Sequence, residues 1–243
     1  MNLVVDIGNS ATKIAVFQSG ELIDRTAFAT KDFFKKFPVF FQNHPEIEQA
    51  ILSSVVNEVP EIEKELQKHF ELLILDQNTN LPFYNLYATP ETLGKDRIAL
   101  MAAAVGKYPS QNVLVIDAGT CITYDFKNDR EEYLGGAISP GLEMRFRALN
   151  QFTSRLPLVR ADEQEGLIGN STEGSIRTGV VAGTTMEIEG FIDAYLSENK
   201  NLTVILTGGD TQILSMRVKN SIFANPNFLL EGLNCILEFN KTQ

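Results

Sequence analysis

The sequence predicts an α/β protein in which two similar domains face each other across a cleft. Its 243 residues, 44% of them hydrophobic, are enough for a folded core and are not typical of a disordered chain. Residues 3–9 (LVVDIGN) and 114–120 (LVIDAGT) superimpose at an offset of 111 residues. At the same offset, residues 21–23 (ELI) fall on residues 132–134 (EYL). We therefore expect a duplication, in which the two repeated aspartates meet in the cleft.

The first domain, residues 1–112, is expected to begin as a meander and to continue with alternating helices and strands. Apolar runs on both sides of a Gly-Asn-Ser turn predict two strands, and a third strand follows. Apolar residues at helical spacing, such as Phe33, Phe34 and Phe37, predict the helices. The predicted elements are strands at residues 3–5, 13–17, 21–27 and 50–55, helices at 31–41 and 61–70, and a loop and helix at 90–108.

The second domain, residues 113–243, repeats the order of strand, Asp-x-Gly-polar turn, strand, turn and strand. A helix around Met144 and Leu149 follows the third strand, and residues 170–197 predict a long helical region. In that region, Gly179 and Gly183 would permit the close approach of another helix. Residues 203–206 predict a strand that runs into a strand-to-helix turn at Thr207–Asp210.

Charge and hydropathy exclude several classes of partner. The chain has 21 basic and 31 acidic residues, a net charge of −10, and both predicted domains are acidic. It therefore has no basic lobe for nucleic acid. Its longest apolar runs, such as residues 113–116, are far shorter than the roughly 20 residues of a membrane span. The N-terminus lacks the basic and apolar segments of a secretory signal, so a cytoplasmic location is expected.

The residue types available for catalysis exclude two common chemistries. Cys121 and Cys235 are expected to be buried thiols, because two cysteines do not make a disulfide framework or a zinc site. His44 and His69 have no ligand-like partner nearby in the sequence, so neither zinc catalysis nor a Ser-His-Asp triad is supported. Catalysis must then depend on carboxylates, hydroxyls, backbone amides, Lys and Arg.

Asp6 ends an apolar strand and is followed by glycine, amide and hydroxyl residues up to Lys13. A carboxylate in this place suits a cation, and a glycine turn lets backbone amides approach a phosphate. A single copy is also compatible with a hairpin turn in which Asp6 binds its own backbone. The second copy at Asp117 and the Thr207–Gly209 segment favour nucleotide binding. The spacing fits neither a P-loop nor a dinucleotide-binding motif.

Asp96 and Arg97 form a charged pair at the start of a predicted helix. As a functional pair, Asp96 would accept a hydroxyl proton while Arg97 held an anionic group. As a structural pair, Asp96 would complement the helix dipole and Arg97 would form a surface ion pair. The residues alone leave both interpretations open. Asp125, Asp129 and Asp162 are interpreted as turn or surface carboxylates outside the site.

In this order and spacing, the motifs resemble those of the type III pantothenate kinases, a family within the superfamily of acetate and sugar kinases, heat-shock chaperones and actin. The resemblance runs over nearly the whole chain and is most specific at the Gly-x-Asp-Arg element, residues 94–97. It implies two ribonuclease H-like (actin-like ATPase) domains. Besides the turns described above, it depends on Gly135-Gly136, Pro140-Gly141, Leu156-Pro157 and Leu230-Glu231-Gly232-Leu233.

The resemblance also implies the role of individual residues. ATP would bind to Asp6, Ile7, Gly8, Asn9, Ser10, Ala11, Thr12 and Lys13 in the first turn and to Thr120 in the second. Pantothenate would bind to Tyr87, Gly94, Lys95, Asp96, Arg97 and, from the partner subunit, Thr172. Asp96 would accept the proton of the primary hydroxyl. Asp117 would help to hold K⁺ or NH₄⁺, which the family requires in addition to Mg²⁺.

The implied reaction is the ATP-dependent phosphorylation of pantothenate to 4'-phosphopantothenate, the first step of coenzyme A biosynthesis, in a homodimer with shared active sites. Other functions are compatible with the same turns. A nucleotide-binding protein, a chaperone-like or filament-like ATPase, or a regulatory factor would use them without small-molecule kinase activity. A kinase of the superfamily that acts on a sugar or N-acetylhexosamine is the nearest alternative among enzymes. Tyr87, Thr172 and residues 94–97 favour the pantothenate kinase.

Overall fold

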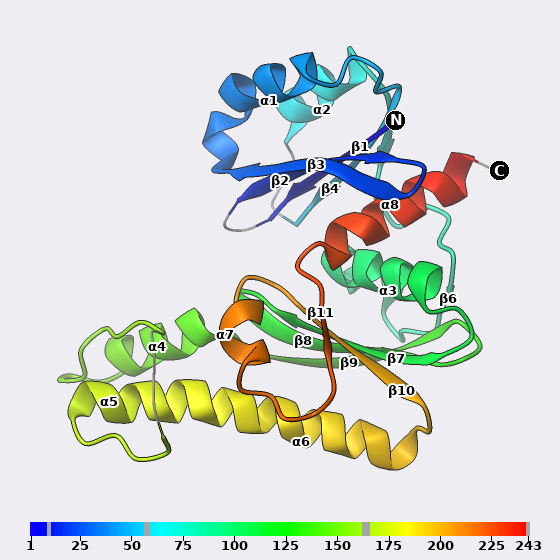
Figure 1. Cartoon of the computed structure of the whole chain (residues 1–243). Helices are drawn as coiled ribbons and strands as arrows, with labels where there is room; N and C mark the ends of the chain where they lie inside the picture. Colours follow the sequence, from blue (N-terminus) through cyan, green and yellow to red (C-terminus); the bar gives the residue numbers. More distant parts are fainter. Residues whose placement is uncertain (9–10, 56–58, 162–165, 242–243) are drawn as a thin grey trace. The chain divides into compact units, whose positions relative to one another are not determined.

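The computed structural model describes residues 1–8, 11–55, 59–161 and 166–241. The chain folds into two compact units (Figure 1). The first unit comprises Met1–Pro109, Glu131–Tyr133 and Asn227–Gln243, and the second comprises Ser110–Arg130 and Leu134–Pro226. None of the helices within the described residues is long and apolar enough to cross a membrane.

The first unit contains a five-stranded sheet in the order β3-β2-β1-β4-β5. Strand β2 is antiparallel to both β1 and β3, whereas β4 runs parallel to β1 and to β5. The meander followed by alternating helices and strands is the order that the sequence predicts. The strands are β1 (Asn2–Ile7), β2 (Thr12–Gln18), β3 (Glu21–Phe28), β4 (Gln49–Ser54) and β5 (Glu71–Ile74). The short strand β6 (Tyr84–Asn85) pairs with Glu132 and Tyr133.

Side-chain alternation along β1 sends its two sets of residues to opposite faces of this sheet. Leu3, Val5 and Ile7 join the hydrophobic core under α1 (Phe33–Gln42) and α2 (Pro60–Gln67). On the other face, the Asn2 amide donates hydrogen bonds to Asn234 and Glu238 of α8 (Phe228–Lys241). Figure 1 shows α1 and α2 on one side of the sheet and α8 on the other. Asp6 therefore belongs to the α8 face.

Helix α3 (Lys95–Lys107) packs side by side with α8 in the same unit. Their backbones approach closely at Gly232, where a Cβ atom would overlap the carbonyl group of Ala99. This contact depends on glycine, because no side chain fits between the two helices at that point. Two short 3₁₀ helices, η1 (Thr30–Asp32) and η2 (Pro90–Thr92), precede α1 and α3.

The second unit contains a sheet in the order β11-β10-β7-β8-β9. As in the first sheet, β7 is antiparallel to β8 and parallel to β10, which is parallel to β11. The strands are β7 (Asn112–Ala118), β8 (Cys121–Lys127), β9 (Glu132–Pro140), β10 (Leu202–Thr207) and β11 (Phe223–Ala224). The two sheets thus repeat one order, which confirms the duplicated α/β fold that the sequence repeat predicts.

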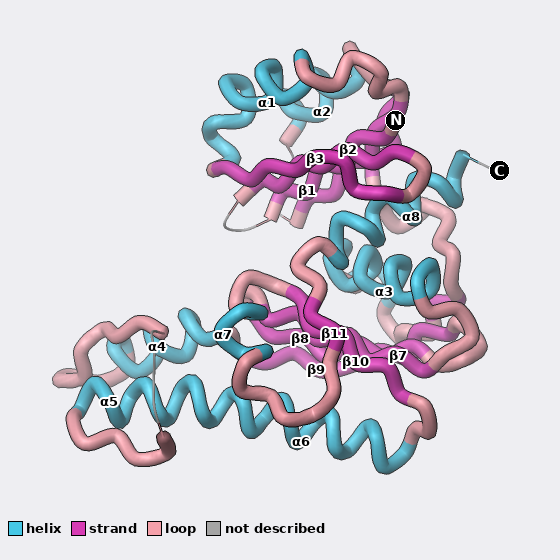
Figure 2. The backbone as a smooth tube through the Cα atoms, viewed as in Figure 1, coloured by secondary structure: helices cyan, strands magenta, loops and turns pink. Residues whose placement is uncertain are grey.

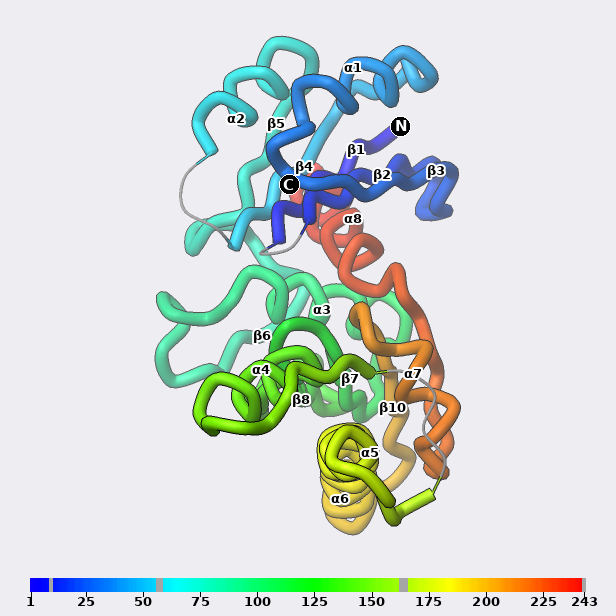
Figure 3. The backbone as a smooth tube through the Cα atoms, turned by 90° about the vertical axis from the view of Figure 1, so that its left-hand side faces the viewer, coloured from blue at the N-terminus to red at the C-terminus, as the bar shows by residue number. Residues whose placement is uncertain are grey.

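Helices pack on the face of the second sheet that carries Leu114 and Ile116 of β7 (Figure 2). Ile188 and Ile192 of α6 belong to the same core. The helices are α4 (Leu142–Gln151), α5 (Thr172–Arg177), α6 (Gly183–Glu198) and α7 (Thr211–Ser215). Figure 3, which looks along α5 and α6, shows that they share one axis. A π-helical segment, Thr178–Ala182, joins them.

Two predictions about single residues are corrected by the structure. Among the described residues, nothing lies within 4 Å of a Cβ built at Gly179 or Gly183, so the space beside them is open and the close approach of another helix stays a prediction. Cys121 and Cys235 are free thiols as expected, but both are only half-buried. Asp125 was expected at a turn or surface, yet it lies within β8 and is fully buried, because β8 extends to Lys127. Asp129 is an exposed turn residue as expected, and Asp162 lies outside the described residues.

Candidate active site

Asp6 is the last-but-one residue of β1 and lies directly opposite Lys13 of β2. The Gly8 N–H donates a hydrogen bond to the Ala11 carbonyl across the turn between the two strands (3.0 Å). Asn9 and Ser10, the other predicted turn residues, lie outside the described part of the chain. The side chain of Ile7 is in the core, so its contact with a phosphate would have to come from its backbone.

Thr12, at the start of β2, is also fully buried, and its hydroxyl donates to the Thr30 hydroxyl. Like Ile7, it contributes backbone rather than side chain to the turn. Ser53 of β4 pairs with Asp6 in the parallel register, and sequence reasoning missed it. Its buried hydroxyl has no hydrogen-bond partner among the described residues. Only the β1–β4 register, which the sequence does not supply, brings Ser53 beside Asp6.

Burial raises the pKa of Asp6 to about 6. The positive charge of Lys13 opposes this increase, and the negative charge of Asp96 adds to it. Asp6 is 4% exposed, so its carboxylate is shielded from water. The electrostatic effect of Asp96 indicates that these two carboxylates, from β1 and α3, lie close enough to interact within the first unit.

Asp96 lies in the first turn of α3, which begins after Gly94. The Arg97 N–H donates to its carboxylate (2.8 Å), and a Cβ at Gly94 would overlap the same carboxylate oxygen. Gly94 therefore leaves room for the Asp96 side chain to bend back over the helix N-terminus, where the helix dipole favours an anion. Lys95 has a different environment and lines a hollow of about 260 Å³ with Asp76, Glu91 and others.

Arg97 is buried, with 5% of its surface exposed, so it does not form the surface ion pair of the structural interpretation. Its guanidinium carbon lies 5.3 Å from the ring centre of Tyr87 and 6.0 Å from that of Tyr133. The two tyrosine rings stack with their centres 5.9 Å apart. The structure thus brings together Tyr87 and Arg97, which are both predicted to bind the substrate. It adds Tyr133, which enters this unit through the pairing of β6 and β9.

In the second unit, Asp117 is the last-but-one residue of β7, the position that corresponds to Asp6 in β1. A Cβ at Gly208, whose φ is +96°, would overlap an oxygen of Asp117 and the carbonyl group of Ala118. Only glycine leaves space around the Asp117 carboxylate here. The positive φ is a second reason, because it is unfavourable for other residues. The Asp210 N–H donates to the Ala118 carbonyl (2.9 Å), which fixes the Thr207–Asp210 turn against the end of β7.

Thr120 lies exposed in the turn between β7 and β8, and its carbonyl accepts a hydrogen bond from the Gly141 N–H (3.1 Å). A Cβ at Gly141 would overlap the carbonyl oxygens of Gly119 and Thr120, so α4 begins directly against this turn. Burial and the charge of Glu143 raise the pKa of Asp210, and a hydrogen bond with the Leu142 backbone lowers it. Asp210, which the sequence analysis did not single out, therefore borders the same turn.

Thr172 begins α5 and lies on the wall of an open pocket of about 690 Å³ in the second unit. The pocket is lined by Leu149, Leu156, Gly169, Asn170, Ser171, Thr172, Ser175, Ile176 and Gly179. Nearby side chains are apolar and exposed, above all Phe152 (82%), Leu167 (66%) and Ile168 (88%).

The oxygen donors of the two turns suit the cations that the sequence predicts, which are Mg²⁺ and K⁺ or NH₄⁺. Within the described residues, no group of three or more His, Cys, Asp or Glu side chains is arranged as a set of metal ligands. Asp6 and Asp117 each offer one carboxylate beside turn backbone. Mg²⁺ in phosphate sites binds one or two carboxylates together with phosphates and waters, and carboxylate and carbonyl oxygens suit hard cations in general. Both aspartates fit such a role.

Comparison with known proteins decides the family. A sequence profile of the type III pantothenate kinases matches residues 2–194. The chain belongs to the type III pantothenate kinase family. The type III pantothenate kinase of Christiangramia forsetii is 58% identical over 243 residues, which are 100% of both chains. That of Flavobacterium johnsoniae is 45% identical over 238 residues, 96% of each chain. The chain is accordingly a kinase that uses an alcohol group as phosphoryl acceptor.

Solved structures with low sequence identity share the fold of this type III pantothenate kinase family member. A protein from Campylobacter jejuni, described as a transcriptional activator of the Baf family, superimposes with a TM-score of 0.66 at 21% identity over 99% of this chain and 100% of its own. A protein from Sinorhizobium meliloti, described as a 2-dehydro-3-deoxygalactonokinase, gives 0.59 at 12% identity over 99% of both chains. The fold is that of the actin-like ATPases and sugar kinases.

Proposed function

We propose that the chain phosphorylates pantothenate with ATP to give 4'-phosphopantothenate, the first step of coenzyme A biosynthesis. The observation that carries this proposal is the cluster in the first unit, where Asp96 lies beside a buried Arg97 that is held against Tyr87. The cluster combines a base for an alcohol, a fixed cation for an anionic substrate and an aromatic surface. The names of the relatives support pantothenate as the alcohol.

Asp96 acts in this proposal as the general base that accepts the proton of the substrate's primary hydroxyl. The helix dipole of α3 and the Arg97 N–H hold its carboxylate in place. Arg97 binds the carboxylate of pantothenate, because a guanidinium recognises a carboxylate through two parallel hydrogen bonds. Tyr87 and Thr172 complete the substrate site. Phosphoryl transfer needs little covalent help from the protein, so positioning and charge neutralisation supply most of the catalysis.

ATP binds in this proposal to the turn from Asp6 to Lys13 and to Thr120, where backbone amides of glycine turns and the Lys13 ammonium contact its phosphates. Asp117 holds K⁺ or NH₄⁺ with nearby carbonyl oxygens, and Gly208 provides the space. Mg²⁺ accompanies the phosphates and, when bound, neutralises the charge that develops during transfer. The carboxylates and carbonyls described above fit both cations.

We further infer a homodimer in which each subunit supplies Thr172 to its partner's substrate site. The exposed Phe152, Leu167 and Ile168 support this arrangement, because large apolar side chains exposed near one pocket are a feature of protein interfaces. The pocket beside Thr172 opens on the same part of the second unit.

The first experiment measures ATP-dependent phosphorylation of pantothenate by the purified protein with Mg²⁺, comparing K⁺ or NH₄⁺ with Na⁺ at equal ionic strength. We expect 4'-phosphopantothenate only with K⁺ or NH₄⁺. Product with Na⁺ at the same rate would contradict the cation site at Asp117. No product with any cation, from a folded protein that phosphorylates a sugar or N-acetylhexosamine instead, would contradict the proposed substrate.

The role of Asp96 is tested with Asp96→Asn, which keeps the size and most hydrogen bonds of the side chain. We expect kcat to fall by roughly 10²–10⁴, the range for loss of a general base. The Kd for pantothenate, measured by calorimetry, should change little, because Arg97 and Tyr87 remain. Asp129→Asn, at an exposed turn, is the control and should leave kcat unchanged. Near-normal kcat in Asp96→Asn would remove Asp96 from this role.

A further inference from the structure

The turn that carries Thr120 is supported by the junction between β9 and α4, which the proposed reaction does not use directly. The junction consists of Ser139, Pro140 and Gly141, where β9 ends and α4 begins. Gly141 is hydrogen bonded to the Thr120 carbonyl, and its lack of a Cβ lets the junction press against the backbone of Gly119 and Thr120. Any displacement of the junction would therefore move the Thr120 turn.

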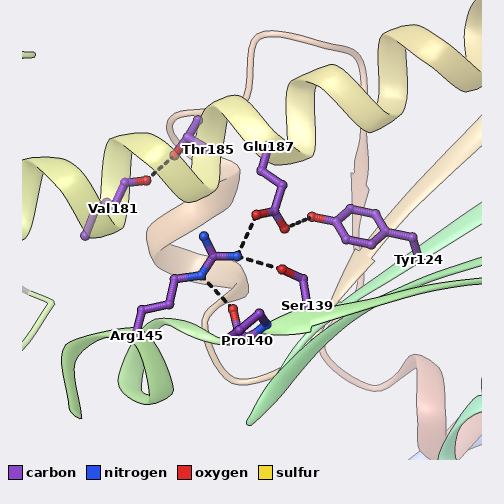
Figure 4. Close-up of polar contacts among 7 residues, drawn as sticks. All are labelled: Tyr124, Ser139, Pro140, Arg145, Val181, Thr185 and Glu187. Atoms are coloured by element: carbon purple, nitrogen blue, oxygen red, sulfur yellow. Dashed lines mark hydrogen bonds and ion pairs between the residues drawn. The ribbon is translucent and has the colours of Figure 1, made fainter. Parts of the chain in front are cut away.

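Arg145, one helical turn into α4, closes this junction from the helix side (Figure 4). Its Nε donates to the Pro140 carbonyl (2.7 Å) and its Nη2 donates to the Ser139 hydroxyl (2.8 Å). The planar guanidinium can make both contacts at once only from one orientation. One side chain thus fixes two consecutive residues of the junction.

Glu187 of α6 and Tyr124 of β8 hold Arg145 in that orientation. The Glu187 carboxylate accepts a hydrogen bond from Arg145 Nη2 at 2.6 Å and from the Tyr124 hydroxyl at 2.9 Å (Figure 4). Tyr124 is fully buried, and its ring stacks on Phe191 of α6 with the ring centres 4.0 Å apart. The network therefore connects the long helix, the sheet and the junction.

The electrostatics agree with a fixed network rather than a surface ion pair. The side chains of Arg145 and Glu187 are 22% and 26% exposed. Burial acts to raise the pKa of Glu187, but hydrogen bonds from Arg145, Ser139 and Tyr124 outweigh it, so the pKa is lowered. Burial and the charge of Glu187 raise the pKa of Tyr124, which keeps its hydroxyl a donor.

We propose that Arg145, oriented by Glu187 and Tyr124, is a positioning residue for ATP, which fixes the β9–α4 junction and thereby the Thr120 turn. This inference rests on the proposed contact of Thr120 with ATP. Arg145 does not touch the nucleotide in this proposal. It acts through the Pro140 carbonyl, the Gly141 N–H and the Thr120 carbonyl, a chain of contacts that lies wholly within the second unit.

The test compares Arg145→Gln and Glu187→Gln with Arg147→Gln as the matched control. Arg147 lies on the same helix, but its side chain is 69% exposed and pairs only with the exposed Glu143 in the contacts described. We expect Arg145→Gln to raise the Kd for a fluorescent ATP analogue and the KM for ATP by about tenfold, as expected for losing hydrogen bonds to a charged group. The KM for pantothenate should stay within about twofold of wild type, since Arg97 and Tyr87 belong to the other unit.

A double-mutant cycle separates positioning from general stability. If Glu187 acts through Arg145, the Arg145→Gln/Glu187→Gln variant should bind the nucleotide no more weakly than Arg145→Gln alone. Additive losses, or a lower melting temperature with unchanged Kd and KM for ATP, would overturn the proposal. Tyr124→Phe keeps the stacking on Phe191 and should show a smaller increase in the same Kd, which provides a test if Arg145→Gln does not fold.

Nucleotide binding is measured without pantothenate, so the result does not depend on the substrate. If wild-type protein binds the ATP analogue but phosphorylates no pantothenate, the proposed reaction fails while the positioning role is still tested. If Thr120→Val leaves the Kd for the analogue unchanged, the contact between Thr120 and ATP fails, and the positioning role fails with it.

Discussion

The Arg97 guanidinium packs against aromatic rings and is shielded from water. Removing a guanidinium from water is costly, and the faces of Tyr87 and Tyr133 offset part of that cost through cation–π contact. The planar group keeps its orientation as a result. A fixed cation next to Asp96 suits a substrate that carries both a carboxylate and a hydroxyl, because one end can be held while the other reacts.

Asp6 gives the unfolding free energy a specific dependence on pH. Its pKa is raised in the folded protein to about 6 from an ordinary value of 3.8. Its protonated form is therefore favoured by folding. The stability that it confers is fully present below about pH 4 and is lost as the pH rises through about 6. This loss amounts to about 3 kcal/mol, because each pKa unit corresponds to about 1.4 kcal/mol.

We expect Asp6→Asn to lack this loss, so that wild type becomes less stable relative to the variant by about 3 kcal/mol between pH 4 and pH 7. Chemical denaturation at a series of pH values measures the difference. Asp129→Asn, in an exposed turn, is the control and should follow wild type throughout. A difference between Asp6→Asn and wild type that does not vary with pH would show that Asp6 is not desolvated.

The sequence indicates individual candidate site residues but not the residues that lie beside them. Asp6, Asp96 and Asp117 follow apolar strands or open a helix, which are local signals. Tyr133 and Ser53 reach the site through strand pairing over long separations in the chain, and one sequence does not specify such register. Asp125 was predicted at a turn or surface because its charge is visible in the sequence, whereas the extent of β8 is not.

At the level of elements, apolar runs predicted strands such as β1, β2, β4 and β10, because most side chains of these strands are buried. The sequence analysis did not predict β5, β6 or β11. The boundaries of the helical region after residue 170 were also close, but the π-helical segment that divides it has no sequence signal that we identified. Helix α8 was not predicted, although Leu229, Leu233 and Ile236 have the helical spacing that would have indicated it. Its partner, α3, is distant in the sequence, so their packing was not predictable either.

The packing of α3 on α8 predicts a large cost for a single methyl group at Gly232. A Cβ there would overlap the Ala99 carbonyl and crowd the Ala103 backbone N, neither of which can turn away as a side chain can. We expect Gly232→Ala to lower the unfolding free energy by about 1–3 kcal/mol, as overpacking does. Because α3 also carries Asp96, kcat should fall as well.

Gly190 is the matched control, since it lies inside α6 with nothing within 4 Å of its added Cβ. Gly190→Ala should stabilise the protein by about 0.5–1 kcal/mol, because alanine loses less backbone freedom in a helix. Thermal denaturation and steady-state kinetics on both variants check these expectations. Equal melting temperatures for the two variants would mean that the helices separate easily at Gly232.

For the whole molecule, duplication supplied two equivalent aspartates that the fold then placed in different environments. Asp6 and Asp117 end corresponding strands of two sheets with the same strand order. Asp6 is buried, whereas Asp117 is only half-buried beside Gly208. Different burial permits the different roles proposed for them, one at the ATP phosphates and one at a monovalent cation. We propose that the duplicated halves divide at residues 112–113, one residue into β7, whereas the two compact units divide between Pro109 and Ser110.

The proposed homodimer predicts that two inactive variants can restore activity when they share a dimer. If Thr172 of one subunit completes the site that contains Asp96 of the other, Asp96→Asn and Thr172→Phe damage the same site from different chains. Each variant alone should be nearly inactive. When the two are unfolded, mixed in equal amounts and refolded together, half of the dimers should be mixed, and each mixed dimer contains one intact site. Activity should therefore return to about a quarter of wild type.

Refolding each variant separately is the control. Recovery no greater than in these controls, from a mixture shown to contain mixed dimers, would mean that each subunit completes its own site.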